Sequence, residues 1–270
     1  MKPKPPYLSL GILAALVLLS LVGPLLYGQD PYTFHKGLIL HPPSPEHLMG
    51  TDRLGRDLLA RIMQGGRVSL LIGVGSAVIA SLIGLIMGVS AGYFRGWWDK
   101  GFVVIVDLFL TFPTFFLLLT LVSYIPASSL ILIIVISITG WMGTARLIRS
   151  ESYRIASQPF IKVLRLARVP TRVVIFKYFL PLLAPIFFVS FTFGVSGAIL
   201  AESGLSYLGL GITPPEMSWG SILSDGKAMM EIAWWVSFFP GLMIFLVTFS
   251  LIQISDWLQE RANRREMAQS

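Results

Sequence analysis

Residues 68–94 read VSLLIGVGSAVIASLIGLIMGVSAGYF and contain no charged side chain. A helix needs about 20 apolar residues to cross a hydrocarbon core of roughly 30 Å, so this stretch is long enough for one crossing. Uncharged stretches of similar length occur at residues 8–27, 178–201 and 232–255. Lipid is therefore the solvent of most of the chain, and the sequence predicts an all-α integral membrane protein.

The stretch at residues 101–145 carries one charge, Asp107, and is too long for a single crossing. As one helix it would measure about 68 Å, more than twice the thickness of the hydrocarbon core. We place a break at residues 125–129, IPASS, where a proline and small polar residues interrupt the apolar run. Pro113 is expected to bend the helix before this break. The sequence thus predicts six transmembrane helices, at residues 8–27, 68–94, 101–124, 128–149, 178–202 and 232–256.

The composition excludes an ordinary soluble domain. Of the 270 residues, 54% are hydrophobic and 13% are charged, and the mean hydropathy is +0.75, whereas about a quarter of the residues in a soluble domain are charged. The chain has no cysteine, which excludes disulfides, thiolate metal ligands and a cysteine nucleophile. Its net charge of +7 could indicate nucleic-acid binding, so the positions of the basic residues matter.

The basic residues follow the positive-inside rule. With both termini cytoplasmic, the inner segments hold 15 of the 21 lysines and arginines, and the first outer loop balances most of its own with Asp30, Glu46, Asp52 and Asp57. The distribution of the basic residues is therefore that of a multi-pass protein of the cell (inner) membrane. Because topology explains the positive net charge, we expect no nucleic-acid partner. The predicted cytoplasmic segments are residues 1–7, 150–177 and 257–270, and the external loops are residues 28–67 and 203–231.

The first apolar stretch follows Lys2 and Lys4, as the apolar region of a secretory signal peptide would. Its length of about 20 residues exceeds that of such a region, and no Ala-x-Ala cleavage site follows before Asp30. We therefore expect it to be a retained transmembrane helix.

The inner loop at residues 150–177 contains a predicted amphipathic helix at residues 159–168, which begins at Pro159. Its apolar residues recur at helical spacing, and its basic residues occupy another face. The periodicity leaves two interpretations open: a helix that lies on anionic lipid headgroups, or a docking helix for a cytoplasmic partner. The apolar residues are Phe160, Val163, Leu164 and Ala167, and the basic residues are Lys162, Arg165, Arg168 and Arg172.

The sequence lacks the motifs of several enzyme and cofactor-binding classes. We find no His-Glu-x-x-His, Gly-x-Ser-x-Gly or Gly-x-Gly-x-x-Gly. The segment 220–227 approaches a phosphate loop, but its spacing is wrong and Ala228 stands where Ser or Thr is required. His35, His41 and His47 recur every six residues, although the prolines between them favour an extended surface loop over a metal site. We expect neither a catalytic residue nor a resident metal or cofactor.

Two features of the membrane segments are open to structural or functional interpretation. Gly84, Gly88 and Gly92 have small-xxx-small spacing, which is typical of a helix face that another helix approaches closely. Asp107 is either a functional charge inside the membrane or a residue near the inner interface that reaches polar groups there.

Three stretches resemble the membrane permease subunits of ATP-binding-cassette (ABC) importers, specifically the C-type subunit of the oligopeptide, dipeptide and nickel group. They are GTDRLGRD at residues 50–57, ESGLSYLGLG at residues 202–211 with SWG at residues 218–220, and Asp107 with Phe112 and Pro113. The resemblance implies the type I importer fold. It implies functional roles on the external side for Asp52, Arg53, Gly55, Arg56, Asp57, Glu202, Leu208, Gly209, Gly211 and Trp219.

The resemblance also implies the partners of the chain. They are a second, homologous permease, two cytoplasmic ATPase subunits that hold ATP and magnesium, an external solute-binding protein, and membrane lipid. The solute would be a short peptide or a related small solute, with nickel or a metal chelate as the alternative. A stand-alone channel or secondary transporter is the rival class, but it would need an ion relay at membrane depth, and Asp107 is the one candidate.

The inner loop departs from the family pattern. Lys162, Val163 and Leu164 stand where the family has Glu-Ala-Ala, and Arg168 stands where it has glycine. The resemblance therefore implies a coupling helix by position and amphipathic pattern, without its hallmark residues. The candidate ATPase contacts are Phe160, Lys162, Val163, Leu164, Arg165 and Arg168.

Overall fold

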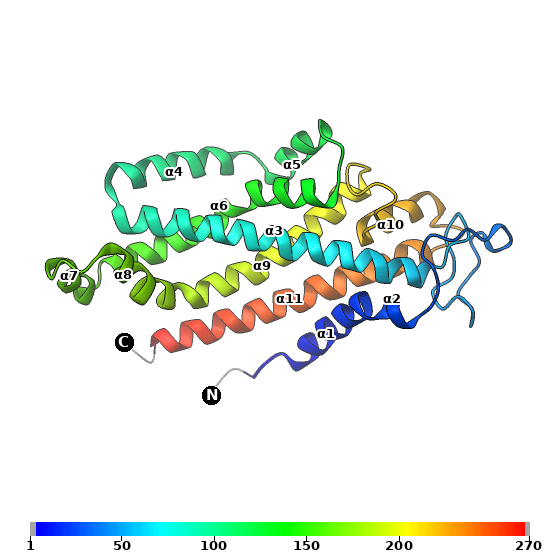
Figure 1. The fold of residues 1–270 in the computed structure, drawn as a ribbon, viewed down its shortest axis with the longest axis horizontal. Coiled ribbons are helices and arrows are strands. Elements are labelled where there is room, and N and C mark those ends of the chain that lie inside the picture. Colours follow the sequence, from blue (N-terminus) through cyan, green and yellow to red (C-terminus); the bar gives the residue numbers. More distant parts are fainter. Residues whose placement is uncertain (1–3, 268–270) are drawn as a thin grey trace.

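The computed structural model describes residues 4–267, with side chains up to residue 264, and consists of long helices that lie side by side (Figure 1). The bundle is built from α3 (Leu58–Phe94), α6 (Ser129–Ala156), α9 (Leu180–Tyr207) and α11 (Trp235–Met267). Shorter elements join or flank these helices: α1 (Tyr7–Leu21), α2 (Gly23–Leu26), η1 (Lys36–Leu38), α4 (Gly96–Thr111), α5 (Thr114–Ser123), α7 (Pro159–Leu166), α8 (Thr171–Val174), η2 (Ile175–Phe179), α10 (Trp219–Gly226) and η3 (Lys227–Met229).

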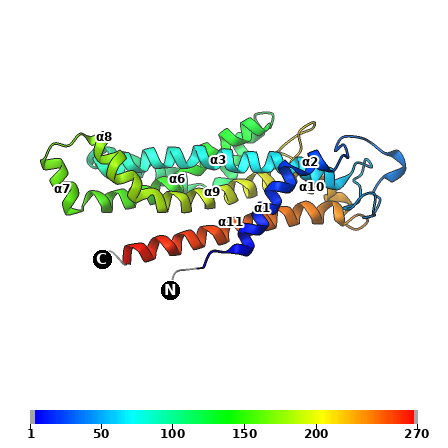
Figure 2. The same ribbon diagram turned by 60° about the horizontal axis from the view of Figure 1, so that its bottom comes forward.

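The two ends of the bundle carry different structures. The loop before α3 and the short helix α10 lie at one end, while α7 and α8 lie at the other (Figure 1). The last helix, α11, runs towards the end that carries α7 and α8. In Figure 2, α1 crosses α11 obliquely, and these two helices are in contact. The predicted external loops at residues 28–67 and 203–231 therefore lie towards one end of the bundle, and the predicted cytoplasmic loop at residues 150–177 lies at the other.

Four helical segments are long and apolar enough to cross a membrane, and a fifth candidate is the pair α4 and α5, which meet at an angle of 79°. The bend expected at Pro113 is confirmed. Phe112 is extended, with φ −87° and ψ 134°, because the proline ring disfavours helical backbone at the preceding residue. The predicted helix at residues 101–124 is thus broken in the middle. The four segments are Leu58–Phe94, Ser129–Ala156, Thr171–Tyr207 and Trp235–Arg264.

The predicted helix at residues 8–27 is also interrupted. The helix α1 ends at Leu21, and the four-residue α2 follows from Gly23, with proline at its start. The guanidinium group of Arg67 donates to the carbonyl oxygens of Ser20 at 3.0 Å and Leu21 at 2.7 Å. Because carbonyl groups at a helix end lack partners within the helix, Arg67 caps this interruption.

Helix boundaries differ from the predicted ones where a charged residue lies inside a helix. The helix α3 begins at Leu58, inside the predicted loop 28–67, and Asp57 caps it by accepting from the Ala60 amide at 2.8 Å. Counting uncharged residues placed the start at residue 68, because Arg61 and Arg67 belong to the first turns of the helix. Likewise, α9 and α10 extend into the predicted loop 203–231, and α11 continues into the predicted tail 257–270, of which residues 268–270 lie outside the described part.

The glycines of α3 face α6. A Cβ atom at Gly88 would lie 2.6 Å from the Ala145 carbonyl oxygen, and one at Gly92 would lie 2.5 Å from Cβ of Ser152. At Gly84, it would lie 2.9 Å from Cβ of Thr144. Contacts this close leave no room for any side chain, so the backbones of α3 and α6 approach each other along the glycine face.

Replacing Gly88 with alanine is expected to destabilise the permease bundle by about 1–3 kcal/mol, because the Cβ would meet backbone atoms that cannot move aside. Gly143 of α6 is the matched control, since a Cβ there has no neighbour within 4 Å. The measurement is the thermal unfolding midpoint of each purified variant. Equal midpoints for the Gly88→Ala and Gly143→Ala variants would contradict tight packing at Gly88.

Candidate functional site

A network of charged side chains joins the loop before α3 to α10 at one end of the bundle. The buried Asp52 carboxylate accepts from the backbone amides of Leu54 at 2.8 Å and Arg56 at 3.0 Å. It also contacts the side chains of Arg56 at 2.6 Å and Arg61 at 2.9 Å. Through Arg61, the network reaches Asp225 on α10, at 3.1 Å. The structure therefore brings most of the predicted charged motif together in one place.

Asp225 is a member of this network that the sequence did not single out. Its carboxylate lies 3.4 Å from Arg53 and 3.8 Å from Arg56, in addition to its contact with Arg61. Burial raises the pKa of Asp225, whereas the positive charges of Arg53 and Arg56 act in the opposite direction. No sequence pattern predicts this contact, because more than 160 residues separate Asp225 from Arg61.

The same loop requires glycine at Gly55. Its φ is +73°, and a Cβ there would lie 2.1 Å from the His35 carbonyl oxygen, so both the backbone angle and the available space exclude a side chain. Nearby, His47 Nδ1 lies 2.8 Å from the Asp57 carboxylate, at hydrogen-bond distance. Within the residues that the structure describes, no three histidine, cysteine or acidic side chains are placed to hold a metal ion.

Glu202 lies buried near the end of α9, and serine hydroxyl groups surround its carboxylate. Ser206 donates to Oε1 at 2.7 Å and Ser218 donates to it at 2.6 Å, while the Ser69 hydroxyl lies 3.4 Å from Oε2. Trp219, at the start of α10, is buried, and its ring N–H donates to the Ile62 carbonyl oxygen at 2.9 Å. These contacts bring together α3, α9 and α10.

The remaining residues of the external motif shape the turn after α9. Leu208 ends the helix and is 53% exposed, and Gly209 follows with a φ of +81°. At Gly211, a Cβ would lie 1.9 Å from the Ser206 hydroxyl oxygen. The turn is therefore tight, and it leaves one large apolar side chain, Leu208, facing outwards.

At the opposite end of the bundle, Ile161 and Arg165 anchor α7 to the rest of the fold. Ile161 is fully buried in a cluster with Tyr93, Ile148 and Phe179. Arg165 donates to the Tyr93 carbonyl oxygen at 3.2 Å, and its guanidinium group lies 4.5 Å from the centroid of the Tyr93 ring. Both contacts hold α7 against the end of α3. Ile161 was not among the predicted contact residues, although it lies three residues before Leu164 on the same helix face.

The outward face of α7 is apolar. Phe160 is 42% exposed, Val163 62% and Leu166 84%, and the spacing of three residues places them along one side of the helix. Lys162 and Arg168 are also exposed. The six candidate contact residues thus divide into two groups: Leu164, which is half-buried, and Arg165 hold the helix in place, whereas Phe160, Lys162, Val163 and Arg168 face outwards.

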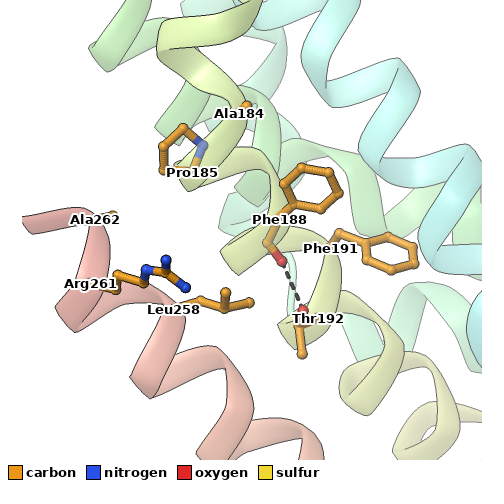
Figure 3. A pocket seen from close by; sticks show the side chains of 8 residues that line it. All are labelled: Ala184, Pro185, Phe188, Phe191, Thr192, Leu258, Arg261 and Ala262. Atoms are coloured by element: carbon orange, nitrogen blue, oxygen red, sulfur yellow. Dashed lines mark hydrogen bonds between the residues drawn. The ribbon is translucent and has the colours of Figure 1, made fainter. Parts of the chain in front are cut away.

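Among the described residues, cavities lie between the long helices, and two of them adjoin α9. Figure 3 shows the larger, about 480 Å³, between α9 and α11; the side chain of Thr192 is turned to the Phe188 carbonyl oxygen, to which it donates at 2.8 Å. It is lined by Ala184, Pro185, Phe188, Phe191, Thr192, Leu258, Arg261 and Ala262. The second cavity, about 230 Å³, lies among α3, α5, α6 and α9, where glycine, alanine, serine and threonine make up most of its lining.

Residues 62–266 match the family described as the binding-protein-dependent transport system inner membrane component. The chain belongs to this family. The match begins within α3, so the external motif at residues 50–57 precedes it.

Relatives that align with more than 90% of this permease are identical to it at about a third of the aligned positions. The oligopeptide transport system permease protein OppC of Mycobacterium tuberculosis H37Rv is 36% identical over 255 residues, covering 92% of this chain and 87% of that protein. OppC of Haemophilus influenzae is 34% identical over 263 residues, covering 96% and 84%. OppC of Bacillus subtilis is 32% identical over 249 residues, covering 92% and 82%.

A solved structure shows the same fold. A chain of the MetNI methionine ABC transporter, in an inward-facing conformation, matches with a TM-score of 0.58 and 16% identity, covering 73% of this permease and 96% of that chain. The permease is therefore the multi-pass inner-membrane component of a binding-protein-dependent ABC transporter and is not itself the catalytic subunit.

Asp107 is placed near a basic residue of the permease. Its carboxylate pairs with the guanidinium group of Arg146 on α6, and both side chains are 55% exposed. One interpretation was that Asp107 reaches polar groups near the inner interface, and the structure shows such a contact with Arg146. A charge within the membrane also needs such a partner, so the ion pair is compatible with both interpretations.

Proposed function

We propose that the permease forms half of the translocation path of an ABC importer for di- and oligopeptides. The observation that carries this proposal is the 32–36% identity, over more than 90% of the chain, to permeases named for oligopeptide transport. In an importer of this kind the separate binding protein selects the solute, so a nickel or metal-chelate importer of the same group is the alternative.

The proposed topology has six crossings with both termini in the cytoplasm. Four long helices and the bent pair α4 and α5 supply five candidates. The sixth would be α1 continued by α2, which together extend from Tyr7 to Leu26 and are capped at their interruption by Arg67. A chain of 20 residues is just long enough to cross the hydrocarbon core.

The proposed partners fit the two ends of the molecule. A homologous permease would complete the path. Two cytoplasmic ATPase subunits would hold ATP and magnesium, and one of them would dock on the apolar face of α7. The external binding protein would dock at the end that carries α10 and the charged network. To shift a two-state equilibrium from 1:99 to 99:1, differential binding must supply about 5.5 kcal/mol, which nucleotide binding by the ATPase pair would provide.

Reconstitution tests the proposal. The permease would be co-expressed with the partner permease and the ATPases of its own system and placed in vesicles with the binding protein outside. We expect ATP-dependent accumulation of a labelled tripeptide or pentapeptide, with no accumulation of nickel. Uptake of nickel alone would establish the alternative, and solute flux through the permease without ATPase subunits would establish a stand-alone channel or secondary transporter.

A further inference from the structure

The Glu202 carboxylate is unusual because it is fully buried and its partners are hydroxyl groups. Each hydrogen bond that the described residues give it comes from a serine: Ser206 and Ser218 at short distances to Oε1, and Ser69 and Ser203 at 3.4 and 3.5 Å to Oε2. A buried carboxylate that lacks such donors is strongly unfavourable. The four serines therefore form a polar pocket built for this one group.

The serines also bind the backbone of the external segment that follows α9. The Ile212 amide donates to the Ser206 hydroxyl at 3.2 Å, the Trp219 amide to the Ser69 hydroxyl at 3.1 Å, and the Ser221 amide to the Ser218 hydroxyl at 3.1 Å. Two of these amides belong to the first turn of α10, where backbone N–H groups have no partner within the helix.

The carboxylate sets the direction of these hydrogen bonds. A serine hydroxyl has a single hydrogen. If that hydrogen is donated to Glu202, the hydroxyl oxygen remains free to accept a backbone N–H. Three chains of hydrogen bonds therefore run from the amides through the serines to one carboxylate. Glu202 thus orients groups on α3, α9 and α10 together, although it contacts none of the three amides directly.

Glycines allow the external segment to approach this pocket. A Cβ at Gly220 would lie 2.6 Å from Cα of Ser203 and 2.9 Å from Cβ of Ser206, in addition to the clash at Gly211 described above. Because neither position has space for a side chain, the turn and α10 pack directly on the α9 backbone. Two separate features, the hydrogen bonds and the glycines, thus fix the same segment to the same place.

We propose that Glu202 is a positioning residue that fixes the turn at residues 208–218 and α10 as a preformed docking surface for the solute-binding protein. The positioning role follows from the contacts of Glu202, whereas the identity of the docking partner rests on the proposed function. Since α10 also carries Asp225, the segment that Glu202 holds is the one joined to Arg53, Arg56 and Arg61.

Glutamine and methionine at position 202 separate this role from simple packing. The carbonyl oxygen of glutamine can accept both short hydrogen bonds, from Ser206 and Ser218, whereas methionine has similar volume but its thioether sulfur is only a weak acceptor. We expect Glu202→Gln to retain the local order. Glu202→Met should leave the serine hydroxyls without their acceptor and release the amides that they hold.

The experiment uses the complete transporter with its ATPases. Hydrogen exchange at the amides of Ile212, Trp219 and Ser221 should accelerate about tenfold in Glu202→Met and by less than about threefold in Glu202→Gln. The concentration of peptide-loaded binding protein that gives half-maximal ATPase stimulation should rise about tenfold in the methionine variant alone. The ATPase rate without binding protein should stay unchanged.

Unchanged exchange in Glu202→Met would overturn the positioning role, and so would equal loss of assembly in the two variants, which would indicate a general requirement for the fold. Ser218→Ala is the second variant: it removes one short hydrogen bond and should accelerate exchange at Ser221, and no change there would also count against the proposal. Faster exchange with normal stimulation would uphold the positioning role and reject docking of the binding protein at this surface.

Discussion

Replacing Leu166 or Val163 with aspartate is expected to reduce ATP-dependent uptake at least about tenfold while the permease still inserts and folds. Both side chains are mostly exposed on the outward face of α7, so no internal packing is lost. In the assembled transporter the ATPase would cover this face. Removing an apolar side chain there costs about 1.5–3 kcal/mol, and burying an unpaired carboxylate costs more. The measurements are uptake into vesicles and recovery of ATPase with the purified permease.

Two control variants separate docking from folding. Thr171→Asp introduces the same charge in the same inner loop, outside α7, at an exposed position, and should leave uptake near normal. Ile161→Ser removes a fully buried side chain that anchors α7. It should therefore lower the free energy of unfolding by about 2–4 kcal/mol. If Leu166→Asp and Val163→Asp retain ATPase binding and normal uptake, α7 does not dock the ATPase.

The basic residues of α7, and Arg168 just after its end, have different expected effects. Arg165 holds the helix against Tyr93, so reversing its charge should displace α7 itself. Lys162 and Arg168 face outwards, and their reversal should affect a partner or the lipid headgroups directly. Variants at Lys162 and Arg168 therefore distinguish a docking helix from an interfacial one: loss of ATPase binding indicates docking, whereas loss of membrane binding by the loop indicates the interface.

The membrane segments could be predicted because lipid imposes a simple rule on them. A long uncharged stretch must be a helix, since its backbone polar groups have no water to bind. The rule failed at helix ends. Arg61 and Arg67 are charged and yet lie in α3, because Asp52 and the carbonyl groups at the end of α1 neutralise or bind them. Sequence periodicity gives no information about partners so distant along the chain.

The sequence indicated many of the residues that belong to the candidate site, but not which of them contact one another. The external motifs at residues 50–57 and 202–211 stand out from the resemblance, yet their connections depend on residues between or beyond them. Asp225 lies outside these motifs, and no pattern marks it. Ser218 belongs to the SWG stretch and Ser69 to a predicted membrane helix, but nothing in the sequence shows that both contact Glu202. In α7, helical spacing identified the apolar residues, whereas the fold decided which of them face inwards.

The charged network at the external end leads to the second prediction of large effect. Replacing Asp52 with asparagine is expected to destabilise the permease by about 3–5 kcal/mol, since breaking a buried ion pair leaves an uncompensated charge. Asp52 and Arg61 are 1% and 3% exposed. Without the Asp52 charge, Arg61 would keep only Asp225, which is the more exposed of its two acidic partners.

Asp225→Asn is the matched control, because it removes a carboxylate from the same network and from contact with the same Arg61. Its side chain is 26% exposed, and burial raises its pKa, which means that the fold already disfavours its charged form. Neutralising it should therefore cost about 1 kcal/mol or less. The comparison is the thermal unfolding midpoint of the two purified variants. A loss at Asp225 as large as that at Asp52 would mean that Arg61 depends on both partners equally, and that the buried pair with Asp52 is not what holds the loop before α3 in place.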